Sequence, residues 1–262
     1  MKLVRFFAIS HGVTWSFFIA AALVGGVDTA AGTVLFALSG LGLLLAGPAL
    51  APLTLSRAER REYRQSIIDV RRIRFPWHLA VFLIPPALVI AGSALAWAVT
   101  GDAAELTELL GSAGFTPFGF LLAIVVAPLL EEMAWRGYAL VELQKRHSAL
   151  TSSLILGFMW AIFHIPLFFI PGTYQHGLGL LTLPFWQFMA AAVIGSVIIT
   201  WIFNNTSYST LSAFLYHAMV NLSGELSKTS VLSDVFYAVV LLGLALFLVL
   251  RFGGRTLTGR TT

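Results

Sequence analysis

The sequence contains no cysteine and few charged residues. The absence of cysteine from the 262 residues excludes disulfide bonds, thiol catalysis and cysteine-ligated metal sites. Charged residues make up 11% of the chain, whereas a soluble domain carries about 25%. Because hydrophobic residues reach 58%, too little polar surface remains to cover the chain in water. The composition therefore indicates a protein whose solvent is lipid.

Long apolar runs fill most of the chain. A membrane-spanning helix needs about 20 largely apolar residues, and no internal repeat or second domain interrupts the runs. The sequence predicts an all-α, polytopic transmembrane helix bundle of about eight spans, with residues 1–262 forming a single membrane domain. The predicted spans are 6–25, 30–55, 77–99, 117–140, 151–171, 182–203, 208–224 and 230–251.

The basic residues support this topology. All of the 16 basic residues except Arg136 and Lys228 fall on one side if the predicted spans alternate. Basic loops face the cytoplasm, so we expect cytoplasmic N- and C-termini and a place in the cell (plasma) membrane. The first run could also be a signal peptide, but its length favours a retained helix. The net charge of +4 sits in loops beside apolar spans, which favours the lipid bilayer over nucleic acid as a partner.

Five ionisable residues of the predicted spans are expected to be buried: Glu131, Glu132, Arg136, His164 and His217. A charge at the bilayer centre costs about 2.5–3.5 kcal/mol on insertion scales. Charged groups at such positions therefore usually mark a functional site. A buried ion pair that only locks helix packing is the structural alternative.

Helix geometry divides the acidic cluster. Glu132 and Arg136 are four residues apart and share a face, so they can neutralise each other. Glu131 lies about 100° further round the helix and must find another partner, which suits a general base. Pro128, one turn earlier, removes a backbone donor and is expected to open the helix there.

Two further motifs carry polar groups at a similar depth. His164 follows Trp160 by four residues, so the two share a face, and the indole N–H is available as a donor. His217 and Asn221 are also four residues apart. This pair could be a polar clamp between helices, or two donors aimed at a developing oxyanion.

The three motifs, in this order, resemble the CPBP family, which contains the type II CAAX prenyl proteases and the bacteriocin-processing or Abi proteins. The matching stretches are Glu131-Glu132-Met-Ala-Trp-Arg136, Trp160-Ala-Ile-Phe-His164 and His217-Ala-Met-Val-Asn221. They define a motif-bearing core at about 117–222. Trp160 replaces the phenylalanine that is commoner in the family, a conservative change.

The resemblance implies an intramembrane endopeptidase that cleaves a membrane-embedded or membrane-associated substrate, including a prenylated CAAX-type one. It implies that Glu131 and His164 activate a water, that His217 and Asn221 stabilise the oxyanion, and that Glu132, Arg136 and Trp160 orient the site. Members are often called metalloproteases. Glu131, His164 and His217 could hold Zn²⁺ with an open fourth position. No His-Glu-x-x-His motif is present, and glutamate-activated water without a metal is slightly favoured.

Two other functions use the same residues. A non-enzymatic scaffold or immunity protein could share the fold, although every motif residue is intact here. A proton-coupled transporter could use buried Glu and His, but it predicts internal repeats, and all the predicted buried charge lies in the second half of the chain.

Overall fold

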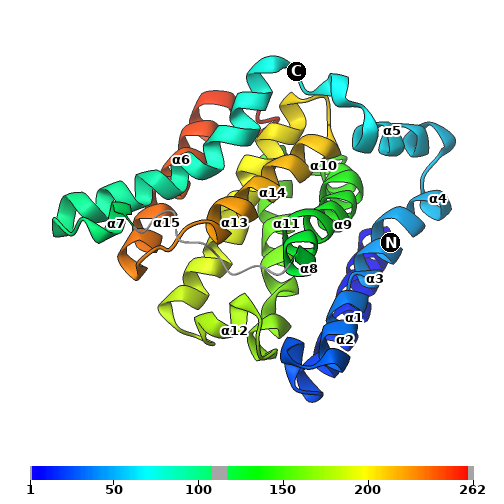
Figure 1. Cartoon of the computed structure of the whole chain (residues 1–262). Helices are drawn as coiled ribbons and strands as arrows, with labels where there is room; N and C mark the ends of the chain where they lie inside the picture. The colour runs from blue at the N-terminus through cyan, green and yellow to red at the C-terminus, as the bar shows by residue number, and fades with distance from the viewer. Residues whose placement is uncertain (1, 108–116, 259–262) are drawn as a thin grey trace.

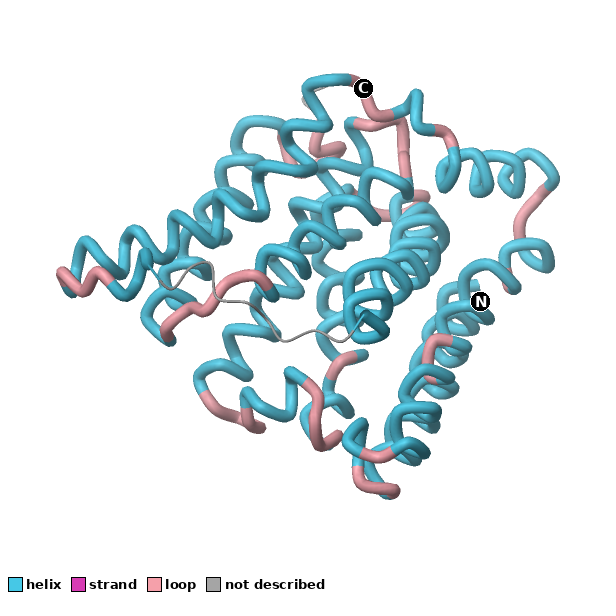
Figure 2. Tube along the Cα trace, in the orientation of Figure 1, coloured by secondary structure: helices cyan, strands magenta, loops and turns pink. Residues whose placement is uncertain are grey.

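The structure is a computed structural model that describes residues 2–107 and 117–258 (Figure 1). Within those ranges every regular element is helical and no strand occurs. Figure 2 shows long helices running between two sets of loops. The predicted all-α, polytopic bundle is therefore confirmed.

The first half of the described chain contains two long helices, with shorter elements between and after them. A π-helical turn at Leu45–Ala49 links α3 to α4, and Pro48 inside it removes a backbone donor. The helices are α1 (Lys2–Leu23), α2 (Ala30–Leu38), α3 (Leu41–Leu44), α4 (Ala51–Thr54), α5 (Arg57–Ile68), α6 (Phe75–Thr100) and α7 (Ala104–Thr107).

The second half contains the predicted motifs. A 3-10 turn at Ile165–Phe169 follows α11. The helices are α8 (Pro117–Phe120), α9 (Ala127–Ala134), α10 (Val141–Gln144), α11 (Ala149–Phe163), α12 (Tyr174–Leu178), α13 (Leu183–Asn205), α14 (Thr210–Glu225) and α15 (Val231–Phe252).

Six helical segments of the described chain are long and apolar enough to cross a membrane, so the predicted count of eight is not confirmed. They are Lys2–Leu23, Ala30–Thr54, Phe75–Thr100, Ala149–Phe169, Leu183–Asn205 and Val231–Phe252. The predicted seventh span corresponds to α14, which has only 16 residues. The predicted fourth span corresponds to α8–α10, a helical line that contains Glu131, Glu132, Arg136 and Glu142.

The line α8–α10 is broken twice by wider turns. π-helical turns at Leu121–Val126 and Trp135–Leu140 flank α9, which carries Glu131 and Glu132. The first turn ends at Val126, two residues before Pro128, close to the position where the missing proline N–H is expected to open the helix. Single π turns inside α-helices are frequent at functional sites. The acidic pair therefore lies on a short α-helical piece between two irregularities.

Helix packing brings the three motifs together. α9 packs against α14, α14 against α13 and α13 against α11. The last turns of α9, the end of α11 and the middle of α14 thus surround one small region of the bundle (Figure 1). Glu131, Glu132, Arg136, His164 and His217 are all buried there, each at most 9% exposed.

The basic segment 56–74, which lies between the predicted spans 30–55 and 77–99, contains a helix. Ser56 starts α5 with a capping box, in which its side chain accepts from the Glu59 N–H and the Glu59 carboxylate accepts from the Ser56 N–H. α5 lies at the same end of the bundle as the described C-terminus (Figure 1).

Candidate active site

Glu132 and Arg136 form the buried ion pair that their spacing predicts. Arg136 Nη1 donates to Glu132 Oε1 at 2.8 Å, and neither side chain is exposed to solvent. Arg136 Nη2 also donates to Ser196 Oγ of α13 at 3.2 Å. Because removing one partner would leave an uncompensated buried charge, breaking this pair costs about 3–5 kcal/mol.

The same carboxylate fixes the histidine of the third motif. His217 Nδ1 lies 2.9 Å from Glu132 Oε1. An ionised carboxylate only accepts hydrogen bonds, so Nδ1 carries the proton. When both ring nitrogens carry a proton, Nε2 donates as well. Glu132 therefore both neutralises Arg136 and orients His217.

Glu131 has a different partner, as helix geometry predicts. The Trp160 indole Nε1–H donates to Glu131 Oε2 at 2.5 Å. Glu131 is 7% exposed. Because its donor is a neutral indole and not a cation, Glu131 is the candidate for the group that takes up a proton.

His164 closes α11 and is held by the main chain. Its Nδ1 lies 2.7 Å from the Trp160 carbonyl oxygen. A carbonyl accepts only, so Nδ1 carries the proton and Nε2 keeps its lone pair when the ring is neutral. The ring also makes edge contacts with Phe163 and Phe188, at centroid distances of 5.5 and 5.3 Å. One nitrogen is thus fixed by the helix and the other is free to accept.

Trp160 contacts four of the five charged or ionisable groups of the site. Its side chain binds Glu131 and its carbonyl binds His164. The Arg136 guanidinium lies over its ring at 4.8 Å, and the His217 ring meets it edge-on at 5.1 Å. The indole N–H that the sequence left available is therefore used to hold the predicted base.

One N–H of the Asn221 carboxamide donates a hydrogen bond to the backbone. Its Nδ2 donates to the Ala123 carbonyl oxygen at 2.9 Å. That carbonyl lacks a helical donor, because the Ala127 N–H bonds to Leu122 and the next residue in π register is Pro128. The second N–H of the carboxamide remains for another acceptor.

Zinc is the cofactor that the family resemblance left open. Glu131, His164 and His217 each have one side-chain atom engaged by another residue. Across residues 2–107 and 117–258, no group of three or more His, Asp or Glu side chains could hold a metal ion. No step below is derived through a metal.

One buried histidine near this region was missed by the sequence reasoning. His11 of α1 is 8% exposed, and its Nε2 lies 3.1 Å from the Met159 carbonyl oxygen of α11. Four residues later, Trp15 Nε1 donates to the Phe163 carbonyl oxygen at 3.1 Å. The four-residue spacing of His11 and Trp15 puts both on one face of the helix, and this pattern could have indicated a polar contact. The N-terminal helix thus holds the segment that presents Trp160 and His164.

Comparisons with known proteins point to the same part of the chain. Residues 113–223 match the family described as type II CAAX prenyl endopeptidase Rce1-like. The chain is 28% identical over 173 residues to CAAX prenyl protease 2 of Methanococcus maripaludis, a match that covers 64% of this chain and 62% of that protein. The chain therefore spans less than two thirds of this relative's length.

Proposed function

We propose that the protein is an intramembrane endopeptidase of the CPBP family, a proposal supported by the family match over residues 113–223 and by the similarity to CAAX prenyl protease 2. Its substrate is a membrane-embedded or membrane-associated peptide, with a prenylated C-a-a-X sequence as the first candidate. The observation that carries the proposal is the pairing of Glu131 with Trp160 beside a separately neutralised Glu132. Two adjacent buried carboxylates in different settings can take different roles.

In the first step a water attacks the peptide carbonyl carbon. Glu131 accepts one water proton, and His164 Nε2 accepts the hydrogen bond of the other O–H, since its Nδ1 is held by Trp160. The oxygen of the attacked carbonyl becomes an oxyanion. His217 Nε2–H and the second N–H of Asn221 are the donors for it, with Glu132 supporting the positive charge on His217.

In the second step the tetrahedral intermediate collapses. Glu131, now protonated, gives its proton to the departing amide nitrogen as the C–N bond breaks. The products are a carboxylic acid and an amine, and the carboxylate of Glu131 is restored. Every group that takes part in these two steps belongs to the protein or to the attacking water.

The distribution of basic residues supports one orientation of the chain in the cell membrane. Lys2 pairs with Glu142, and Lys145 with Glu59 and Glu142. These basic residues and α5 therefore lie at one end of the bundle. Because basic residues gather on the cytoplasmic side, we propose that both termini are cytoplasmic.

The test is hydrolysis of a prenylated C-a-a-X peptide by purified protein, followed by mass spectrometry. Glu131→Gln keeps the hydrogen-bond acceptor for Trp160 but removes the base. We expect the rate to fall at least about 100-fold, the contribution of general-base catalysis, while the protein stays folded in detergent. Glu142→Gln is the matched control, because it neutralises a buried glutamate of the same helical line outside the site, and its rate should stay near that of the wild type.

A Glu131→Gln variant that hydrolyses the peptide at the wild-type rate would remove the assignment of Glu131 as the base. A cellular phenotype that survives the Glu131 substitution would instead favour a non-enzymatic scaffold. Elemental analysis of the same preparation tests the metal question separately. Stoichiometric zinc that is lost in a His164→Ala variant would replace the proposed water activation with a metal-bound one.

A further inference from the structure

The two faces of α5 carry different chemistry. At about 100° per residue, Glu59, Tyr63 and Ser66 share one face, and Arg57, Arg61 and Arg64 share the opposite face. The first set faces the bundle, and Tyr63 and Ser66 are buried. The three arginines are exposed. α5 therefore has an inner docking face and an outer basic face.

The inner face is fixed to the bundle by polar contacts. Tyr63 Oη donates to the Met133 carbonyl oxygen at 3.2 Å, next to Glu132, and the Ser66 and Thr210 hydroxyls are 2.8 Å apart. The Glu59 carboxylate accepts from Lys145. The position of α5 is thus set by its contacts with the segment α8–α10 and with α14.

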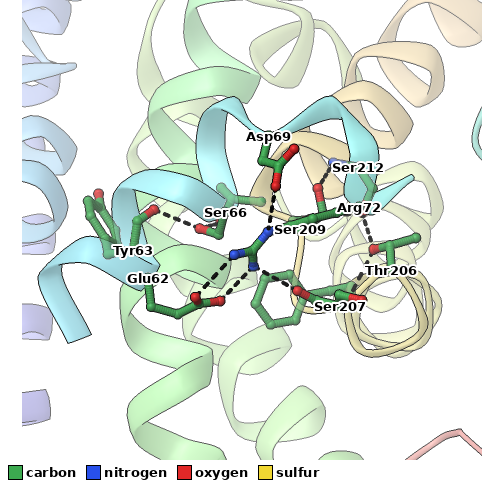
Figure 3. Close-up of polar contacts among 11 residues, drawn as sticks. Glu62, Tyr63, Ser66, Asp69, Arg72, Thr206, Ser207, Ser209 and Ser212 are labelled. Carbon is green, nitrogen blue, oxygen red and sulfur yellow. Dashed lines mark hydrogen bonds and ion pairs between the residues drawn. The ribbon is translucent and has the colours of Figure 1, made fainter. Parts of the chain in front are cut away.

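The acidic residues of this segment are neutralised within the molecule. Arg72 donates to both oxygens of Glu62, at 2.6 and 3.1 Å, and to the Ser207 carbonyl oxygen, while its Nε lies 3.9 Å from Asp69 (Figure 3). The hydrogen bond from Arg72 lowers the pKa of Glu62. The hydrogen bond from Lys145 lowers the pKa of Glu59 to about 2. These carboxylates are therefore not available to the outer arginines.

The outer arginines have no such partner. Among the described residues, the side chains of Arg57, Arg61 and Arg64 take part in no hydrogen bond or ion pair. Arg71 and Arg74 extend the exposed positive charge beyond the end of the helix. Large exposed apolar side chains flank the same stretch: Leu53, Ile68, Val70 and Phe75, at 65–81% exposure.

Unpaired arginines beside exposed apolar side chains match the boundary between lipid headgroups and acyl chains. α5 is also placed there by the chain, because it lies between the candidate spans Ala30–Thr54 and Phe75–Thr100. We propose that α5 is an interfacial helix whose outer face, Arg57, Arg61 and Arg64, binds anionic phospholipid headgroups of the surrounding bilayer. This inference does not depend on the proposed peptidase activity.

The experiment uses the full chain in nanodiscs that contain spin-labelled phosphatidylglycerol or phosphatidylcholine. Electron paramagnetic resonance gives the fraction of each label held at the protein surface. The wild type should prefer the anionic lipid, and raising the salt concentration should weaken that preference. Arg57→Gln/Arg61→Gln/Arg64→Gln should lower it by about tenfold or more, since each basic residue near the surface contributes a severalfold factor.

The matched control is Arg5→Gln/Arg146→Gln/Arg255→Gln, which removes the same net charge from three exposed arginines on other elements. It should keep most of the preference. An equal loss in both triple variants would show a diffuse charge effect and overturn the proposal, as would no loss in the α5 variant. Excess inorganic phosphate at constant ionic strength should not compete, and full competition by it would replace the lipid with a free-phosphate site.

Discussion

At the scale of single residues, the site depends on one indole. Trp160 is the only described side chain that donates a hydrogen bond to Glu131, and its carbonyl fixes the His164 tautomer. A carboxylate buried without its donor carries a desolvation cost of about 1–3 kcal/mol. Trp160 stands where the family more commonly has phenylalanine. In this chain it therefore contacts the predicted base, Glu131.

Trp160→Phe should separate packing from hydrogen bonding. The change keeps an aromatic ring but removes the donor to Glu131, so we expect a rate loss of about tenfold or more from a cost of about 1–3 kcal/mol. The measurement is the peptide hydrolysis rate beside the melting temperature. Trp135→Phe is the control, because the Trp135 N–H is buried without a hydrogen-bond partner. Equal rate losses in both variants would mean that the Trp160 N–H has no special role.

The residue pairs were predictable where one helix holds both partners. The spacing of Glu132 and Arg136 fixed their contact, and that contact is observed at 2.8 Å. Contacts between helices were not predictable in this way. That His217 binds Glu132, and that Trp160 binds Glu131, depends on how α9, α11 and α14 pack. Periodicity within one helix carries no information on that packing.

At the scale of elements, the motif helix is irregular because of its own sequence. Pro128 was expected to open the helix, and the π-helical turn Leu121–Val126 ends two residues before it. The sequence could predict neither the length of that turn nor the presence of the second π-helical turn at Trp135–Leu140, since no proline or glycine pattern marks a π turn. The partner of the freed carbonyl, Asn221, comes from another helix. The contact between Asn221 and the Ala123 carbonyl could therefore not be predicted from the sequence.

A double-mutant cycle tests whether Asn221 satisfies the carbonyl that Pro128 leaves unpaired. Asn221→Leu alone should destabilise the protein by about 1–3 kcal/mol, because the Ala123 carbonyl loses its donor. In a Pro128→Ala background the restored N–H can take over, so the same change should cost less. Thermal unfolding in detergent measures both. Strictly additive losses of stability would contradict the coupling. A loss of the peptide hydrolysis rate on Asn221→Leu in both backgrounds would reflect the proposed oxyanion role of Asn221 instead.

At the scale of the whole molecule, the site depends on a helix outside the family match. α1 lies before residues 113–223, yet His11 and Trp15 bind two carbonyl groups near the end of α11. The Phe163 carbonyl needs such a donor, because the Leu167 N–H, four residues on, bonds to His164 instead. α11 therefore ends in an orientation that α1 sets.

Trp15→Phe should weaken catalysis through this contact. Removing the N–H frees the Phe163 carbonyl next to His164, and we expect a stability loss of about 1 kcal/mol. Because only the position of His164 changes, kcat should fall several-fold while KM for the prenylated peptide stays within about twofold. Trp186→Phe provides the control, since that side chain is 57% exposed and takes part in no hydrogen bond described for the chain. A lower melting temperature with unchanged kcat would limit α1 to a purely structural role, because the site would then tolerate the loss of its outer support.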